Sequence, residues 1–129
     1  MEEGLVVPVI RDADQKSLTQ ISKEIKDLAG LAKDRKLQAQ DMQGNTFTVS
    51  NLGMFGIDEF TAIINPPDAC ILAVGRIAPR LVMDNGQVKE SNFMKVTLSC
   101  DHRVVDGSIG AKFLQTLKNI MEEPILLVM

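Results

Sequence analysis

Residues 96–107, which read V-T-L-S-C-D-H-R-V-V-D-G, constrain the fold more than any other part of the chain. Apolar and polar residues alternate over residues 94–101, which is the period of a half-buried strand. His102, the only histidine of the chain, follows this strand. Asp106 and Gly107 come four and five residues later, and a helical pattern then begins. In α/β folds a turn from a strand end into a helix is a common place for functional residues.

His102 has two interpretations at this stage. It could be a structural histidine that fills a hydrogen-bonded position beside the strand end. It could also be a general base, because imidazole titrates near pH 6.5 and can both accept and return a proton. Asp101, Arg103 and Asp106 could orient the ring or the loop around it. His-x-x-x-Asp is a loose pattern, so the residues alone leave both interpretations open.

The remaining pattern predicts an alternation of helices and strands. Residues 5–10 are predicted to form a short strand that lies at an edge of the sheet or is bulged at Pro8, because proline cannot donate to a strand ladder. Ser17 is expected to cap a helix that ends near Arg35. Its apolar stripe follows spacings of three and four: Leu18, Ile21, Ile25, Leu28 and Ala32. A second helix is expected to begin with Ser108 as its cap and to end at Pro124.

Between the two helices the sequence predicts mainly strands. Residues 46–49 form a β-rich run that leads to Ser50, followed by a glycine-containing turn. The continuous apolar run 69–74 predicts a central strand that is buried on both faces. Extended segments 76–83 and 88–91 flank an Asn-Gly pair that is typical of a hairpin, and the strand 93–100 follows. This order of elements favours an α/β two-layer domain with a mixed or mostly antiparallel sheet.

Size, charge and cysteine content exclude several functional classes. A chain of 129 residues suffices for one domain with a core, and its net charge of −3 provides no basic face for nucleic acid. No apolar run reaches the ~20 residues of a membrane span, and the first ten residues do not resemble a signal peptide. Cys70 and Cys100 are expected to be buried free thiols, and two cysteines with one histidine do not make a zinc or other metal site.

Three motifs in order, T-F-T-V-S-N-L-G-M-F-G, I-I-N-P-P and S-C-D-H-R-V-V-D-G, resemble the catalytic domain of dihydrolipoamide acyltransferases. These proteins are the core subunits of 2-oxoacid dehydrogenase complexes. The resemblance covers essentially all 129 residues, and the sequences of the motifs are most similar to those of the pyruvate type. The family's catalytic domain is longer than this chain, so residues 1–129 are expected to be its C-terminal part. The N-terminal half, the lipoyl domain and the peripheral-subunit-binding domain would lie outside these residues.

The resemblance also implies a fold and a mechanism. The fold would be that of chloramphenicol acetyltransferase, here as a partial domain. His102 would deprotonate the thiol of coenzyme A, which would attack the acetyl thioester of a dihydrolipoyl group without a covalent acyl-enzyme. Ser50 would donate a hydrogen bond to the oxyanion, and Asp106 would order the loop. Asp101 and Arg103 would be structural, and the residues that contact coenzyme A and lipoamide stay unassigned.

The resemblance implies partners as well. In relatives the active site lies between the subunits of a homotrimer, with the histidine and the serine on different chains, and the trimers build a large hollow core. That core works with the other subunits of the complex in the bacterial cytoplasm or the mitochondrial matrix. Two alternatives stay open: an acyltransferase of the 2-oxoglutarate or branched-chain type, and a non-catalytic core subunit. Without the resemblance, Ser50 would be read as an ordinary turn residue.

Overall fold

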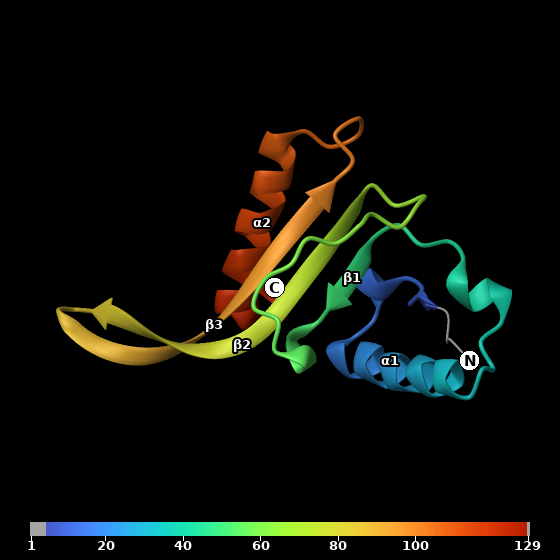
Figure 1. The fold of residues 1–129 in the computed structure, drawn as a ribbon, viewed down its shortest axis with the longest axis horizontal. Coiled ribbons are helices and arrows are strands. Elements are labelled where there is room, and N and C mark those ends of the chain that lie inside the picture. Colours follow the sequence, from blue (N-terminus) through green and yellow to red (C-terminus); the bar gives the residue numbers. More distant parts are fainter. Residues whose placement is uncertain (1–4, 129) are drawn as a thin grey trace. The chain divides into compact units, whose positions relative to one another are not determined.

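The computed structural model describes residues 5–128, which fall into two compact units, Met1–Asn45 and Thr46–Met129 (Figure 1). The first unit contains helix α1, Leu18–Lys33, with the short 3-10 helices η1, Ala13–Gln15, and η2, Ala39–Met42, on either side of it in the chain. The second unit contains the strands β1, Thr48–Asn51, β2, Cys70–Asp84, and β3, Gln87–Cys100, together with helix α2, Gly107–Glu122. Its 3-10 helices are η3, Gly53–Phe55, and η4, Pro124–Val128.

Helix α1 begins where the sequence predicts. The Ser17 hydroxyl accepts a hydrogen bond from the Gln20 backbone N–H at 3.2 Å, and the Gln20 side chain accepts one from the Ser17 N–H at 2.8 Å. This reciprocal capping box satisfies two donors that a helix start would otherwise leave unpaired. The last helical residue is Lys33, and Asp34 is the C-cap, close to the predicted end at Arg35.

The predicted edge strand over residues 5–10 is wrong. These residues have no regular secondary structure, and one backbone hydrogen bond of 2.8 Å joins the Val9 N–H to the Asp41 carbonyl. Pro8 has no N–H to donate, and within the described residues no strand lies alongside this segment to form a ladder. The apolar character of residues 5–10 was therefore not sufficient evidence for a strand.

The second unit is built on a mixed sheet with the order β1-β2-β3. β1 runs parallel to β2, and β3 runs antiparallel to it, which confirms the predicted α/β class with a mixed sheet. The core lies on the central strand, as predicted for residues 69–74: Ile71, Leu72, Ala73 and Val74 are all buried. These four residues carry side chains on both faces of the sheet, because successive strand residues alternate.

Helix α2 covers one of these faces (Figure 1). The rings of Phe47 and Phe113 pack at a tilt of 37° with centroids 5.6 Å apart, and Gly110 is buried. A Cβ at Gly110 would lie 3.5 Å from the Cys100 Sγ atom. The opposite face carries Thr48, whose hydroxyl donates to the carboxylate of Asp68, and both residues are buried. The segment between β1 and β2 is thereby attached to this second face.

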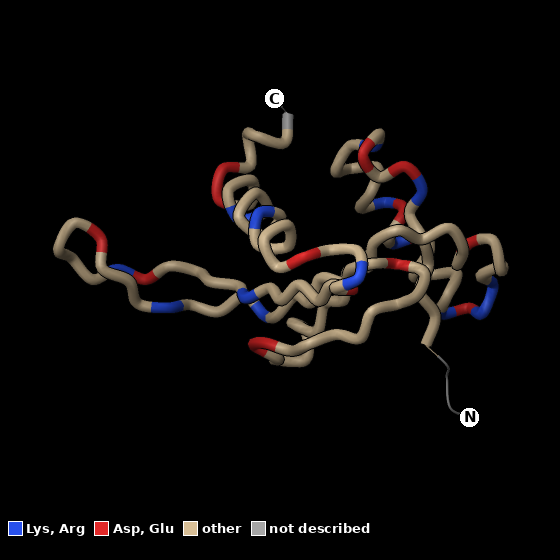
Figure 2. Tube along the Cα trace, turned by 90° about the horizontal axis from the view of Figure 1, so that it is seen from above, with Lys and Arg blue, Asp and Glu red and all other residues tan. Residues whose placement is uncertain are grey.

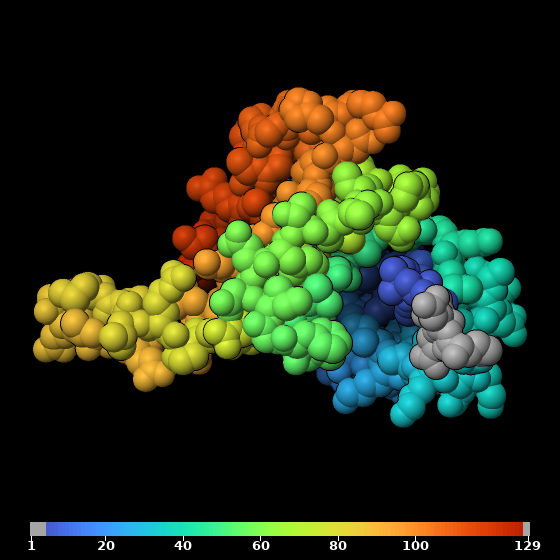
Figure 3. Space-filling view, viewed as in Figure 1, coloured from blue at the N-terminus to red at the C-terminus, as the bar shows by residue number. Residues whose placement is uncertain are grey.

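The β2–β3 hairpin turns at the predicted Asn-Gly pair. Asn85 and Gly86 both have positive φ, 52° and 76°, as a type I′ turn requires. The sequence predicts two separate segments after this turn, whereas β3 is one continuous strand, because residues 91 and 92 stay in register with Arg80 and Pro79. The tip of the hairpin protrudes from the second unit in the space-filling view, and several of its apolar side chains are exposed: Ile77, Leu81, Met83 and Val88 (Figure 3).

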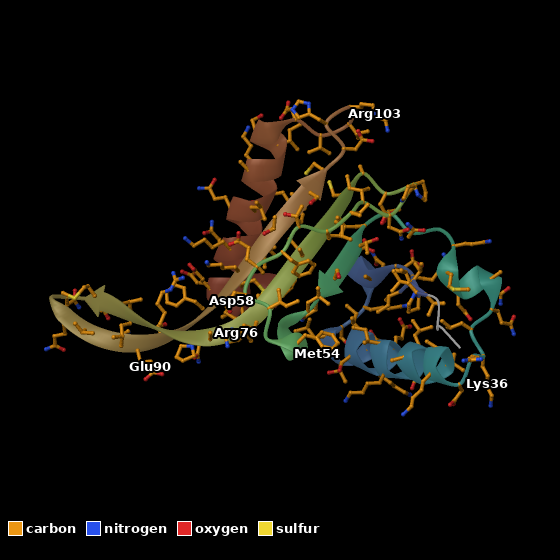
Figure 4. The ribbon with its side chains drawn as sticks, in the orientation of Figure 1. Lys36, Met54, Asp58, Arg76, Glu90 and Arg103 are labelled. Atoms are coloured by element: carbon orange, nitrogen blue, oxygen red, sulfur yellow. The ribbon has the colours of Figure 1, made fainter. Side chains whose placement is uncertain are left out.

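A bulge in β2 brings the segment after β1 into close contact with the strand. The register shifts between Val74 and Ile77, and the Arg76 N–H donates to the Ile57 carbonyl at 2.9 Å. The Arg76 side chain also pairs with Asp58, and Figure 4 shows the two labels side by side. A Cβ on Gly75 would lie 1.9 Å from the Asp58 carbonyl oxygen, so the bulge needs glycine.

Replacing Gly75 by alanine is therefore expected to destabilise the second unit by about 1–3 kcal/mol, the usual cost of overpacking. The clash is with backbone atoms, which cannot rotate away as a side chain would. Urea denaturation of Gly75→Ala measures this loss. Gly107→Ala is the matched control, because a Cβ there meets no atom within 4 Å. Equal stability of the two variants would contradict the close approach at Gly75.

Candidate active site

Ser50 is the third residue of β1, where the strand pairs with Ala73 of β2. The turn that follows is fixed by backbone contacts: the Leu52 N–H donates to the Val74 carbonyl at 3.2 Å, and the Asn51 side chain accepts from the Gly53 N–H at 2.8 Å. Ser50 is half-buried, and its hydroxyl makes no hydrogen bond to any described residue. The fold thus presents a serine hydroxyl on a well-held strand end.

His102 lies in the turn that follows β3. The Asp101 N–H donates to the Ala69 carbonyl at 2.7 Å, and the Asp101 carbonyl accepts from the N–H groups of both Val104 and Val105 at 2.9 Å. The turn therefore closes around Asp101. His102 itself is exposed, and its ring has no hydrogen bond or ion pair with the described part of the chain. This geometry does not fit a structural histidine held beside the strand end.

Asp101 and Arg103 form an ion pair within the same turn. The guanidinium donates through Nε to one carboxylate oxygen at 3.0 Å and through a terminal nitrogen to the other at 2.7 Å. Hydrogen bonds from Arg103 lower the pKa of Asp101 to about 2, so this carboxylate is ionised at neutral pH. Figure 4 shows Arg103 beside the loop at the end of β3. These contacts support a structural role for the pair.

Asp106, and not the predicted Ser108, is the N-cap of helix α2. Its carboxylate accepts from the Ile109 backbone N–H at 2.9 Å and from the Ser108 hydroxyl at 2.8 Å. Both hydrogen bonds stabilise the charged form and lower the pKa of Asp106 below its usual value. The sequence D-G-S offers two capping residues, and the backbone uses the first, so that Gly107 becomes the first helical residue. Asp106 thereby fixes the point at which the His102 turn ends.

Asp106→Ala is expected to lower the thermal unfolding midpoint by roughly a few degrees, whereas Asp106→Asn should retain most of it, since asparagine is an equally good cap. The charge part of this stabilisation has a defined pH window. Because the pKa of Asp106 is lowered in the folded protein, this charge-dependent stabilisation is present above the ordinary carboxyl pKa of 3.8. It is lost as the pH falls below that value. Thermal melts of the three proteins at pH 7 and pH 3 test this, and an Asn variant as unstable as the Ala variant at pH 7 would contradict the cap.

Ser50 and His102 do not meet within one chain. Ser50 pairs with Ala73 of β2, and Ala73 pairs with Thr97 of β3. Cys100 lies three residues after Thr97 along β3, and His102 lies beyond Cys100. Three residues of rise and two strand spacings place Ser50 about 14 Å from Cys100 at ordinary sheet dimensions, and His102 farther still. One chain thus presents a half-buried serine on one outer strand of the sheet and an exposed histidine after the other outer strand.

Sequence reasoning missed two features near Ser50. One is the buried Thr48–Asp68 hydrogen bond, and the other is the close approach at Gly75. An aspartate next to a buried apolar strand was a usable signal for the first, since buried carboxylates need partners. The second depends on a contact between residues that are distant in sequence, and no local pattern reveals it.

Lys and Arg residues are interspersed with Asp and Glu residues along the described chain (Figure 2). Among residues 5–128 there is no group of three or more His, Cys, Asp or Glu residues arranged to hold a metal ion. No helix within the same residues has the length and apolar character that crossing a bilayer requires.

Comparison with known proteins identifies relatives over the whole chain. The family model described as "2-oxoacid dehydrogenases acyltransferase (catalytic domain)" matches residues 1–129. The dihydrolipoyllysine-residue acetyltransferase component of the pyruvate dehydrogenase complex from Rickettsia felis is 50% identical over 128 residues, which are 99% of this chain and 31% of that protein. A mitochondrial component of the same name from Arabidopsis thaliana is 53% identical over 126 residues, covering 95% of this chain and 23% of the relative. The chain thus spans about a third or less of these relatives.

Solved structures agree with the observed fold. Azotobacter vinelandii dihydrolipoamide acetyltransferase superposes with a TM-score of 0.93 at 40% identity, covering 98% of this chain and 52% of that one. The cubic core of a pyruvate dehydrogenase multienzyme complex gives a TM-score of 0.93 at 39% identity, with the same coverage.

The Azotobacter enzyme was studied for the role of a serine, a histidine and an asparagine in its catalytic mechanism. In its numbering the histidine follows the serine by 52 residues and the asparagine follows the histidine by 4. Ser50, His102 and Asp106 have the same two spacings here, with aspartate in the third position. Because the family model matches residues 1–129 and the fold is shared with these solved structures, this chain belongs to the acyltransferase family of the 2-oxoacid dehydrogenases.

Proposed function

We propose that this chain contributes to an acetyltransferase that moves an acetyl group between dihydrolipoamide and coenzyme A in a pyruvate dehydrogenase complex. The proposal rests on the spacing of Ser50, His102 and Asp106, which matches the spacing of the serine, histidine and asparagine in the Azotobacter enzyme, and on the shared fold. Because the relatives are longer, residues 1–129 would act as part of a larger catalytic domain.

His102 is the proposed general base. A thiol becomes a strong nucleophile only when it loses its proton, and an imidazole near neutral pKa is suited to accept it. His102 would take the proton from the coenzyme A thiol, and the thiolate would attack the acetyl thioester carbon. When the tetrahedral intermediate collapses, His102 would return the proton to the dihydrolipoyl sulfur that leaves. The exposed ring supports this role, since a substrate can reach it.

Ser50 is the proposed hydrogen-bond donor to the oxyanion. Its strand is held at both ends, by the buried Thr48–Asp68 pair and by the turn at Gly53, so the backbone that carries the hydroxyl is held in place before the reaction. Such preorganised donors stabilise the charge that develops on the carbonyl oxygen. Asp106 would act as a positioning residue, because its cap fixes the end of the His102 turn. An asparagine can make the same cap, which is consistent with the residue type in the Azotobacter enzyme.

The separation of Ser50 from His102 favours an active site shared between subunits. We propose that the histidine of one chain meets the serine of the next in a homotrimer, and that trimers assemble into a core like the cubic core to which the fold is similar. The exposed apolar side chains of the β2–β3 hairpin and of η4 are consistent with burial in such an assembly: Ile77, Leu81, Met83, Ile125 and Leu127. The lipoyl group would arrive as a substrate on a separate domain, and the core would bind the other subunits of the complex.

The pyruvate type is favoured over the 2-oxoglutarate and branched-chain types by the names of the relatives, which are pyruvate dehydrogenase components from bacteria and from mitochondria. The same names favour the bacterial cytoplasm or the mitochondrial matrix as the location. Presence of both Ser50 and His102 argues against a non-catalytic core subunit.

The test is acyl transfer from acetyl-, succinyl- and isobutyryl-coenzyme A to dihydrolipoamide by the assembled enzyme that contains this chain. We expect the highest kcat/KM with the acetyl donor. A preference for the succinyl or isobutyryl donor would assign one of the other complexes, and no transfer with any donor would indicate a non-catalytic subunit.

A further inference from the structure

Cys70 and Cys100 face each other across β2 and β3. The two residues are direct partners in the antiparallel register, and their Sγ atoms are 3.6 Å apart. Both are free thiols, and both are partly accessible to solvent. None of the steps proposed for acetyl transfer uses either of them.

The backbone geometry of this strand pair favours a disulfide bond between Cys70 and Cys100. The Asp101 N–H donates to the Ala69 carbonyl at 2.7 Å, so Ala69 and Asp101 form a hydrogen-bonded pair. Antiparallel pairs alternate, and Cys70 and Cys100 therefore form a non-hydrogen-bonded pair, in which the Cα atoms are about 4.5 Å apart and the side chains are closer. This separation lies within the range of about 4.4–6.8 Å that disulfides span.

Little movement is needed to close the bond. A disulfide has an S–S length of about 2.05 Å, so the two sulfur atoms would have to approach by about 1.5 Å, which side-chain rotation can supply.

From this geometry we propose that Cys70 and Cys100 are a dithiol modification site that is oxidised to an intrachain disulfide by small-molecule disulfides. One cysteine, as its thiolate, attacks a sulfur of the oxidant, forming a mixed disulfide and releasing one small thiolate. The second cysteine loses its proton to solvent and attacks the cysteine sulfur of the mixed disulfide, releasing the second small thiolate. Two protein thiols are thereby oxidised, and one small disulfide is reduced to two thiols.

Exchange that begins at Cys70 is expected to be slow at neutral pH, because the thiolate form of this residue is disfavoured. Burial and the neighbouring Cys100 raise the pKa of Cys70. The product would join the start of β2 to the end of β3, two residues before His102. Closing this loop constrains the unfolded chain, so the oxidised protein is expected to have a higher unfolding midpoint than the reduced protein.

The test uses glutathione disulfide and the folded, fully reduced protein at pH 8.5. After blocking free thiols, intact mass and peptide mapping should show the loss of two hydrogen atoms and a linked pair of peptides that contain Cys70 and Cys100. Dithiothreitol should restore both thiols. Cys70→Ser and Cys100→Ser should each stop at a stable glutathione adduct, because the second cysteine is missing.

Wild-type protein that keeps a glutathione adduct, forms only interchain dimers, or retains both thiols would overturn the proposal. The same reaction in 8 M urea is the reference: a linked pair that forms there but not in the folded protein would also count against it. Because the readout is mass and not acetyl transfer, the result is independent of the proposed enzyme activity.

Discussion

His102→Ala is expected to slow acetyl transfer by roughly 10²- to 10⁴-fold, the usual contribution of a positioned general base. The effect should fall on kcat and on kcat/KM alike, since the proton transfer belongs to the reaction step. Some rate should survive and rise with pH, because a few per cent of a free thiol is ionised at pH 7 and this fraction grows as the pH increases.

The fold should tolerate this change. The His102 ring is exposed and makes no hydrogen bond within the described residues, while the turn itself is held by backbone contacts to Asp101. Circular dichroism and thermal melts provide the folding control for the steady-state assay with coenzyme A and dihydrolipoamide. A folded His102→Ala enzyme with near-normal turnover would exclude the general-base role.

Ser50→Ala is expected to reduce turnover by roughly 10²- to 10³-fold, the typical loss of one oxyanion donor. Michaelis constants should change little, because this hydrogen bond strengthens only as charge develops in the transition state. Ser99→Ala is the matched control: Ser99 is also a half-buried serine in the sheet, where it pairs with Ile71, but it has no role in the proposed mechanism. Similar losses of activity in the two variants would point to a general disturbance of the sheet and against an oxyanion role.

Local patterns in the sequence predicted the elements whose causes are local. The Ser17 capping box, the Asn85-Gly86 turn and the buried strand over residues 69–74 all follow from residue types at short spacing, and the structure confirms them. The helix cap at Asp106 was missed in favour of Ser108, because both residues can cap and only the backbone of the turn decides between them.

Features that depend on distant contacts were not predictable in this way. The apolar residues 5–10 suggested a strand, but a strand needs a partner, and among the described residues this segment has one backbone hydrogen bond, from the Val9 N–H to the Asp41 carbonyl. The close approach at Gly75 depends on Asp58, seventeen residues earlier. The sequence indicated His102 by its place after a strand and Ser50 only through the resemblance to a family, and their placement on the two outer strands of the sheet required the strand register.

An active site that is shared between neighbouring chains can be tested by a mixing experiment. His102→Ala and Ser50→Ala enzymes are each expected to be nearly inactive. If they are unfolded together and reassembled as an equal mixture, some interfaces will combine an intact histidine from one chain with an intact serine from the next.

Random assembly into cyclic trimers would place both intact residues at about a quarter of the interfaces, so activity should recover to about a quarter of that of wild-type enzyme treated in the same way. Sedimentation must show that both variants have entered the same assemblies, and each variant reassembled alone should stay inactive. Recovery to about this level is expected if Ser50 and His102 of neighbouring chains form the active site. Mixed assemblies that stay as inactive as the single variants would contradict an active site built from Ser50 and His102 of neighbouring chains.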